Sequence, residues 1–252
     1  MTDLTEPESP YAEQLRRYAR ALAAGRADDV SAALAEGSSP AHVMLFTEGN
    51  RAKRHEKLRA QLEFVAVAFT GFENLLAAYL RDRPPAASDT GAGDADRFLE
   101  WLGKTCGLTP EQHDYVACQR ARHAVEAEAF RNRAGHVRFQ ELWATAQRRA
   151  AALDTDAGLR VHLNPIRAWS RFATAALLHT ERVLPADVLF FAVGTEICTA
   201  VLEPKGRERI EELASYGPCT LNQWAGRTRH ADGGELVELC RDLAEMGLVA
   251  FS

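Results

Sequence analysis

Several features that would assign a function directly are missing from this sequence of 252 residues. Its five cysteines are an odd number without a Cys-x-x-Cys pair, which argues against a disulfide framework and a zinc knuckle. The sequence contains no phosphate-binding loop, dinucleotide fingerprint or nucleophile elbow. The longest apolar runs, 65–69 and 188–193, fall well short of the roughly 20 residues that a membrane span needs. The polar start also lacks a signal peptide's basic and apolar regions, so we expect a soluble cytoplasmic protein with no membrane partner.

Positive charge is scarce at the C-terminal end of the chain. Residues 1–184 contain 24 acidic and 24 basic residues, whereas residues 185–252 contain eleven acidic residues and six Lys or Arg. The net charge of −5 therefore belongs entirely to the C-terminal segment. Because nucleic-acid binding depends largely on neutralising phosphates, this balance argues against nucleic acid as a partner.

Residues 1–184 have mainly helical periodicity, and we expect them to form one helical domain. Apolar residues recur every three or four positions from Leu58 to Leu80, which predicts a long helix in a bundle. The Pro- and Gly-rich stretch Arg81–Asp96 predicts a flexible loop at about 82–96, and the basic run Arg51–Lys57 predicts a solvated helix face. Further helices are expected at 11–22, 28–36, 96–106, 110–133 and 137–153. Residues 159–183 are ambiguous: they can open with a short strand, while 168–182 have helical propensity.

Residues 185–252 predict a hairpin followed by three helices, so the expected fold class is α+β and mainly α. Two apolar runs, 188–193 and 197–202, are separated by Gly194-Thr195-Glu196, as in a β-hairpin. Helices are expected at 206–215, after Thr220, and at 234–246. Gly247 is placed to end the last helix before a terminal strand at 248–251.

Helix, turn and helix followed by a third helix is the layout of a winged helix, whose usual function is DNA binding. Here the third helix has the wrong charge, because residues 231–249 contain five acidic residues and one basic residue, Arg241. Few residues follow this helix, so a wing is not expected. These observations favour a peptide over DNA.

The C-terminal segment is similar to the PqqD-like recognition element of peptide natural-product (RiPP) pathways, over about 65 residues. The resemblance is carried by Leu202, Pro204 and Gly206 in the turn into the first helix, by the turn Gly217 to Thr220, and by the last helix, ELVELCRDLAEMGLV. It implies a winged-helix relative that binds the leader segment of a ribosomally made precursor peptide. In that family the leader adds as a further strand on the sheet edge and lies against the third helix.

This binding mode suits the residues here, since an exposed strand edge offers unpaired backbone groups and neighbouring side chains supply selectivity. The predicted peptide-binding residues are an edge strand and one face of the third helix. They are Thr199, Ala200, Val201, Leu202 and Glu203 on the strand, and Val237, Cys240, Arg241 and Ala244 on the helix.

A helical domain before such an element is similar in layout to the partner subunits of multinuclear non-heme iron oxidases, as in the methanobactin and 3-thiaglutamate pathways. The resemblance implies a non-catalytic subunit without a cofactor of its own. Its partners would be a precursor peptide and a barrel-fold oxidase that carries the iron, joined to this chain as a heterodimer.

Two other functions stay open at this point. One is a transcriptional regulator with a helical sensor domain. The other is a helical metalloenzyme, although the sequence has no Glu-x-x-His pair of the kind found in ferritin-like sites. Its candidate metal ligands would be Glu73, His123, Glu126 and His179.

Overall fold

The computed structural model describes residues 40–83, 91–153, 156, 158–178, 183–227 and 233–252. It is α+β and mainly helical with two small antiparallel sheets, which confirms the expected fold class. The chain divides into two compact units, Met1–Gly107 and Leu108–Ser252, so the expected boundary at 184–185 lies inside the second unit. None of the described helices is both long and apolar enough to cross a lipid bilayer.

The described part of the first unit is a bundle of α3 (Pro40–Gln61), α4 (Glu63–Ala68), α5 (Phe72–Asp82) and α6 (Gly91–Thr105). The single helix expected through Leu58–Leu80 is wrong, because the chain turns at Gly71, whose φ of 76° favours glycine. The apolar residues of that stretch are nevertheless buried together, from Leu58 at 1% exposure to Leu80 at 8%. The expected helices at 11–22 and 28–36 lie outside the described residues.

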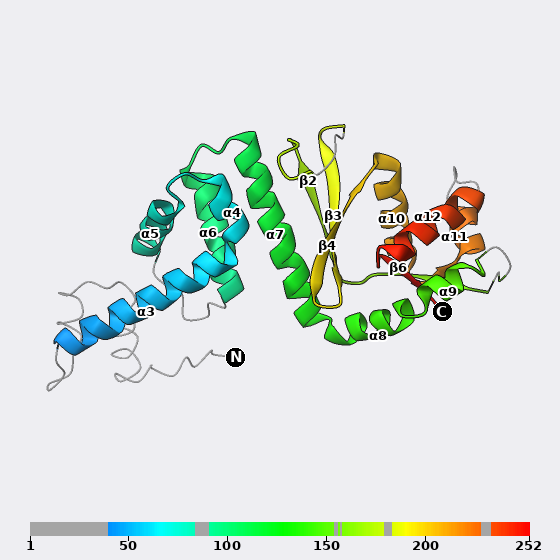
Figure 1. Ribbon diagram of the computed structural model, residues 1–252, viewed down its shortest axis with the longest axis horizontal. Helices are drawn as coiled ribbons and strands as arrows, with labels where there is room; N and C mark the ends of the chain where they lie inside the picture. Colours follow the sequence, from blue (N-terminus) through cyan, green and yellow to red (C-terminus); the bar gives the residue numbers. More distant parts are fainter. Residues whose placement is uncertain (1–39, 84–90, 154–155, 157, 179–182, 228–232) are drawn as a thin grey trace, which may run out of the picture. The chain divides into compact units, whose positions relative to one another are not determined.

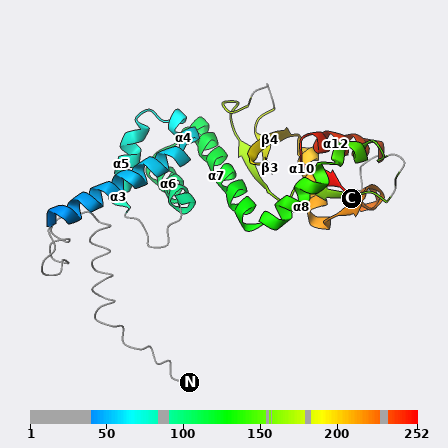
Figure 2. The same ribbon diagram turned by 60° about the horizontal axis from the view of Figure 1, so that its bottom comes forward.

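Helices α3, α5 and α6 pack around a cluster of aromatic rings, and α3 crosses α6 in both views (Figures 1 and 2). Phe98 of α6 contacts Phe72 and Tyr79 of α5 edge-on, with ring centroids 5.7 and 5.3 Å apart. Helix α6 begins at Gly91, so the loop expected at 82–96 extends too far. Residues 91–96, the last part of the expected loop, instead form the first turns of α6.

The second unit begins with α7 (Pro110–Arg131), α8 (Arg133–Trp143) and α9 (Ala146–Ala150). Thr109 caps α7 through a reciprocal pair of hydrogen bonds with Gln112, and Pro110 occupies the first turn. Because α8 ends at Trp143 and α9 begins at Ala146, the helix expected over 137–153 is interrupted between them.

The strands in the described residues after α9 are β1 (Arg160–Leu163), β2 (Arg167–Phe172), β3 (Ala186–Val193), β4 (Glu196–Leu202), β5 (Cys219–Thr220) and β6 (Val249–Phe251). They form two antiparallel sheets, in the orders β2-β3-β4 and β5-β1-β6. The hairpin of β3 and β4 and the terminal strand β6 confirm the sequence prediction. The sequence left 159–183 ambiguous, and in the structure Ala168 to Phe172 pair with β3 despite their helical propensity.

Strand β3 is buried on both faces of its sheet. Val188, Phe190 and Ala192 pack with residues of α7, whereas Leu189 and Phe191 join the core formed with the C-terminal helices. Helix α7 and the C-terminal helices accordingly lie on opposite sides of β2-β3-β4 (Figure 1). This double burial explains why β3 reads as a continuous apolar run.

The C-terminal helices are α10 (Pro204–Tyr216), α11 (Leu221–Arg227) and α12 (Gly233–Glu245), as the sequence predicts. Thr220 caps α11 through Gln223. Helix α12 ends at Glu245, and Gly247, two residues later, has a φ of 85°. A Cβ atom there would lie 2.8 Å from Cγ2 of Val193, so both the backbone conformation and the packing require glycine.

Asn164 joins the two sheets where β1 leads into β2. Its side chain is fully buried and donates to the carbonyls of Ala192, at 2.8 Å, and Gly247, at 3.0 Å. Its Oδ1 accepts from the Ile166 N–H at 2.9 Å. Strands β1 and β2, which precede the predicted C-terminal segment, are therefore integral to the core of the second unit.

Candidate functional site

Strand β4 forms one outer edge of the sheet β2-β3-β4. Gly194 and Thr195 form a two-residue turn in which Gly194 has a φ of 61° and no described non-glycine residue has a positive φ, as in a type II′ hairpin. The Ala192 N–H donates to Ile166 on the β2 side at 3.1 Å. Ala192 therefore directs its backbone away from β4, and so its partner Ile197 is not hydrogen-bonded to it. Because backbone direction alternates along a strand, the next residues Cys198 and Ala200 point their backbone groups toward β3 at every second position. Ile197, Thr199 and Val201 therefore point theirs away from the sheet.

The side chains along this edge are small or apolar and carry no charge between Glu196 and Glu203. Ile197 and Val201 are half-buried against the α7 side of the sheet, and Cys198 and Leu202 against the other side. Thr199 is exposed in the middle. Within the described part of the chain β4 pairs with β3 alone, so its outer backbone groups have no partner strand. The side chains on both sides of these groups are apolar or small.

The opposite edge of the same sheet, β2, differs in its side chains. Arg167 and Arg171 flank Trp169, and charged residues on an edge strand oppose pairing with another chain. Helix α10 also holds the centre of β2. Glu211 accepts from the Trp169 indole N–H, and Arg207 lies over the ring at 4.9 Å. Of the two edges, β4 is the unprotected one.

The predicted strand residues fall on β4, with two changes. Glu203 is the N-cap of α10 and its carbonyl accepts from the Arg207 N–H at 3.0 Å, so it does not extend the open edge. Ile197 also lies on the edge, although it is outside the predicted set. Ala200 is 6% exposed and its backbone faces β3, so only Thr199 and Val201 of the predicted set point outward.

The predicted residues of the third helix lie in different surroundings. Helix α12 packs against α9, α11 and β6, whereas β4 packs against β3 and α10. Cys240 and Ala244 are 0% and 1% exposed, because their side chains pack into the core. Burial raises the pKa of the Cys240 thiol to about 12. Val237 and Arg241 are half-buried.

Arg241 and Ala244 line a shallow pocket of about 350 Å³ between α12 and α9. Its other walls are Gln147, Ala150, Ala151 and Glu245. Next to it, the Trp143 indole N–H donates to the Ala244 carbonyl at 2.7 Å, which fixes the end of α12 against α8. The structure thus brings two of the four helix residues to a pocket, with α9 rather than β4 as the opposite wall.

The outer face of α12 is acidic. Glu235, Glu238, Asp242 and Glu245 are all exposed and recur at steps of three and four residues, so they follow one face of the helix. Only Glu235 has a described ion pair among them, with Arg209 of α10 at 2.8 Å. This face would repel the phosphates of a duplex.

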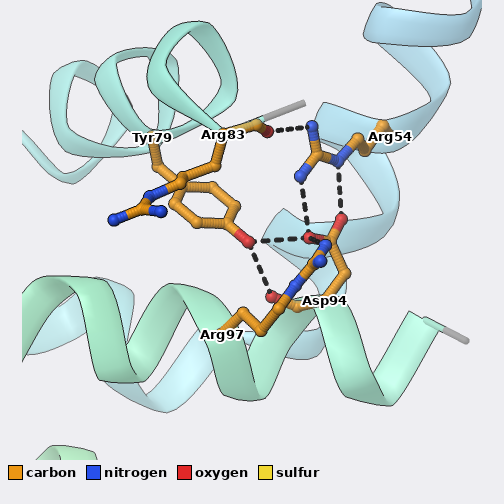
Figure 3. Close-up of polar contacts among 5 residues, drawn as sticks. All are labelled: Arg54, Tyr79, Arg83, Asp94 and Arg97. Atoms are coloured by element: carbon orange, nitrogen blue, oxygen red, sulfur yellow. Dashed lines mark hydrogen bonds and ion pairs between the residues drawn. The ribbon is translucent and has the colours of Figure 1, made fainter. Parts of the chain in front are cut away.

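A charged hydrogen-bonded cluster in the first unit joins α3, α5 and α6 (Figure 3). Asp94 accepts from Arg54 at 2.6 and 2.8 Å, from the Tyr79 hydroxyl at 2.8 Å and from Arg97 at 3.0 Å. Arg54 also donates to the Arg83 carbonyl at 2.8 Å. Arg54 was expected on a solvated face and Asp94 in a loop, so the cluster corrects both expectations.

Burial and the hydrogen bond to Asp94 raise the pKa of Tyr79 to about 12. Burial alone would raise the pKa of Asp94, but hydrogen bonds from Arg54, Tyr79 and Arg97 outweigh it and lower that pKa to about 2. The Asp94 carboxylate is therefore charged and fully occupied by donors. The cluster locks three helices together and presents no reactive group.

The candidate metal ligands do not form a site in the described residues. Glu73 is exposed in the first unit and pairs with His55 and Arg59, each at 3.0 Å. His123 is buried in the second unit beside Gln119, at 3.0 Å, and Glu126 is exposed. His179 lies outside the described residues. No group of three or more His, Cys, Asp or Glu side chains suited to a metal ion occurs in the part of the chain described above.

The chain matches no protein-family model, and no curated protein matches it.

Proposed function

We propose that this chain is a peptide-binding subunit that captures a precursor peptide on the outer edge of β4 and presents it to a modifying enzyme. The observation that carries the proposal is that β4 is an edge strand without protecting charges. The outward backbone groups of Ile197, Thr199 and Val201 are placed to pair with an extended segment, and the half-buried apolar residues beside them offer selectivity.

The elements around β4 support the same function. The hairpin of β3 and β4 followed by three helices, with an acidic last helix, fits the resemblance of residues 185–252 to a leader-binding element. The partner enzyme would be a metal-dependent oxidase that carries the iron, and this chain would contribute binding only. Holding the peptide by its leader raises the effective concentration of the remainder at the enzyme's active site.

The test is a calorimetric titration of the full chain with candidate precursor peptides, each alone and together with a candidate oxidase. The full chain is required because an isolated 185–252 fragment lacks β1 and β2, which pair within both sheets. We expect saturable binding with a Kd of micromolar or below. No binding by the full chain, either alone or with the oxidase, would contradict the proposal.

A proline exchange locates the binding edge. Thr199→Pro removes an outward N–H without touching the ladder to β3, so peptide affinity should fall at least about tenfold. Arg171→Pro is the matched control, since it removes an outward N–H from the opposite edge and should leave affinity unchanged. Equal losses in both variants, or none in Thr199→Pro, would place the peptide elsewhere.

A DNA-binding regulator is the second candidate, and one observation favours it. Helix α10, β5, α11, α12 and β6 follow the order of a winged helix, and β1 pairs with both β5 and β6 as the middle strand. The acidic face of α12 opposes this function. Retention of a specific duplex by the full chain at low salt, and its loss on adding salt, would support the regulator.

A further inference from the structure

The sequence of β4 is self-complementary about its central residue. If two copies of the strand pair antiparallel with Thr199 on the two-fold axis, Thr199 faces Thr199 of the second copy and Ile197 faces its Val201. All three outward residues of each copy are then paired. Each of them is β-branched, the type of side chain that packs best across neighbouring strands.

This register also opposes no like charges. Glu196 faces Leu202 of the second copy, and Glu203 faces its Thr195, so neither carboxylate meets another. Shifting the register by two residues in either direction leaves one outward residue of each copy beyond the Ile197–Val201 ladder. The centred register is therefore the one that uses the whole edge.

Strand β2, the opposite edge of the sheet, does not allow the same two-fold antiparallel pairing. Antiparallel pairing of two β2 strands about Trp169 places Arg167 opposite Arg171 of the second copy, twice. Like charges directly opposite each other destabilise a strand pair. The two edges of one sheet thus differ in whether they permit a symmetric pair.

From this difference we propose that the chain forms a two-fold-symmetric dimer through β4, joining two three-stranded sheets into one of six strands. The dimer contact is isologous, as in most homodimers. Because a single strand pair buries less area than a standard interface, we expect a weak dimer whose population depends on protein concentration. The dimer does not depend on the proposed function, but it occupies the same backbone groups as an added peptide strand.

The test is sedimentation equilibrium of the full chain from 1 to about 200 µM, with exchanges at the axis. The native chain should dimerise, and Thr199→Lys and Thr199→Glu should each be monomeric, because each places two like charges face to face. An equimolar mixture of these two variants should recover the dimer, since Lys then faces Glu. Thr199 is exposed, so both variants should fold, as circular dichroism can check.

Arg171→Glu on the opposite edge is the control and should leave the dimer intact. A native chain that stays monomeric throughout, a dimer that survives both single exchanges, or a mixture that stays monomeric would each overturn the proposal. Adding the precursor peptide tests competition separately and rests on the proposed function. A peptide that binds while the dimer persists contradicts the shared edge, whereas a peptide that does not bind counts against the proposed function alone.

Discussion

The Arg54–Asp94 cluster and the β4 edge are opposites in how their polar groups are paired. In the cluster, a buried carboxylate receives hydrogen bonds from Arg54, Tyr79 and Arg97 and has no capacity left for a ligand. On the edge, neutral backbone groups of Ile197, Thr199 and Val201 face away from the sheet. A charged cluster here stabilises a helical bundle, whereas the candidate binding surface consists of uncharged backbone groups.

Removing Asp94 should have the largest effect on stability. Asp94→Ala leaves Arg54 partly buried without its carboxylate, and breaking a buried pair in this way costs about 4 kcal/mol. Hydrogen exchange of the α6 amides should report the loss within the first unit. The control Glu100→Ala removes an exposed partner of Lys104 from the same helix and should cost less than about 1 kcal/mol. Similar losses in both variants would show that the cluster contributes little.

Proline exchanges at two neighbouring residues of β4 should differ in their cost to stability, because one removes an N–H that faces β3 and the other an N–H that faces outward. Cys198→Pro removes an N–H directed at β3 and should cost about 3 kcal/mol, because a buried carbonyl loses its donor. Thr199→Pro removes an outward N–H and should cost about 1 kcal/mol or less. Urea unfolding of the two variants measures the difference, and equal costs would contradict the assigned backbone directions.

The cluster should also give a defined pH dependence. The folded-state pKa of Asp94, about 2, lies below its unfolded value near 4, so its contribution is complete above about pH 4 and is lost as pH falls toward 2. A shift of this size corresponds to about 2.5 kcal/mol. Unfolding free energies of the native chain and Asp94→Asn should therefore differ at pH 7 and converge below pH 4. A difference that stays constant down to pH 2 would assign the effect to packing.

The sequence predicted elements best where apolar period and turn residues agree. The hairpin around Gly194, the cap at Thr220 and the helix end at Gly247 were all predicted, because each has a local chemical signal. Strand β2 was missed, since RAWSRF mixes charged and apolar residues without a clear alternation and obtains its structure from pairing with β3. The secondary structure of such segments depends on tertiary contacts, which cannot be read from the sequence pattern.

The candidate site was predicted in part for a similar reason. The sequence identified β4 as an edge but could not tell which residues point outward, because that depends on the ladder to β3. Cys240 and Ala244 were placed on an exposed face of the last helix, yet α9 and the core cover that side. The Asp94 cluster was missed because its members come from three helices and Asp94 follows a Gly-rich stretch.

The position of β1 also determines the order in which the molecule can assemble. Residues of β1 pair with β5 and with β6, and His162 contacts Ser252 across a sequence separation of 90 residues. During synthesis the helices of the first unit leave the ribosome early and can fold at once, whereas β1 must wait for partners that are made much later. Long-range pairing of this kind slows folding. The second unit should therefore complete its core last, and a nascent chain shortened before β6 should leave the β6 side of β1 unpaired and open to chaperones.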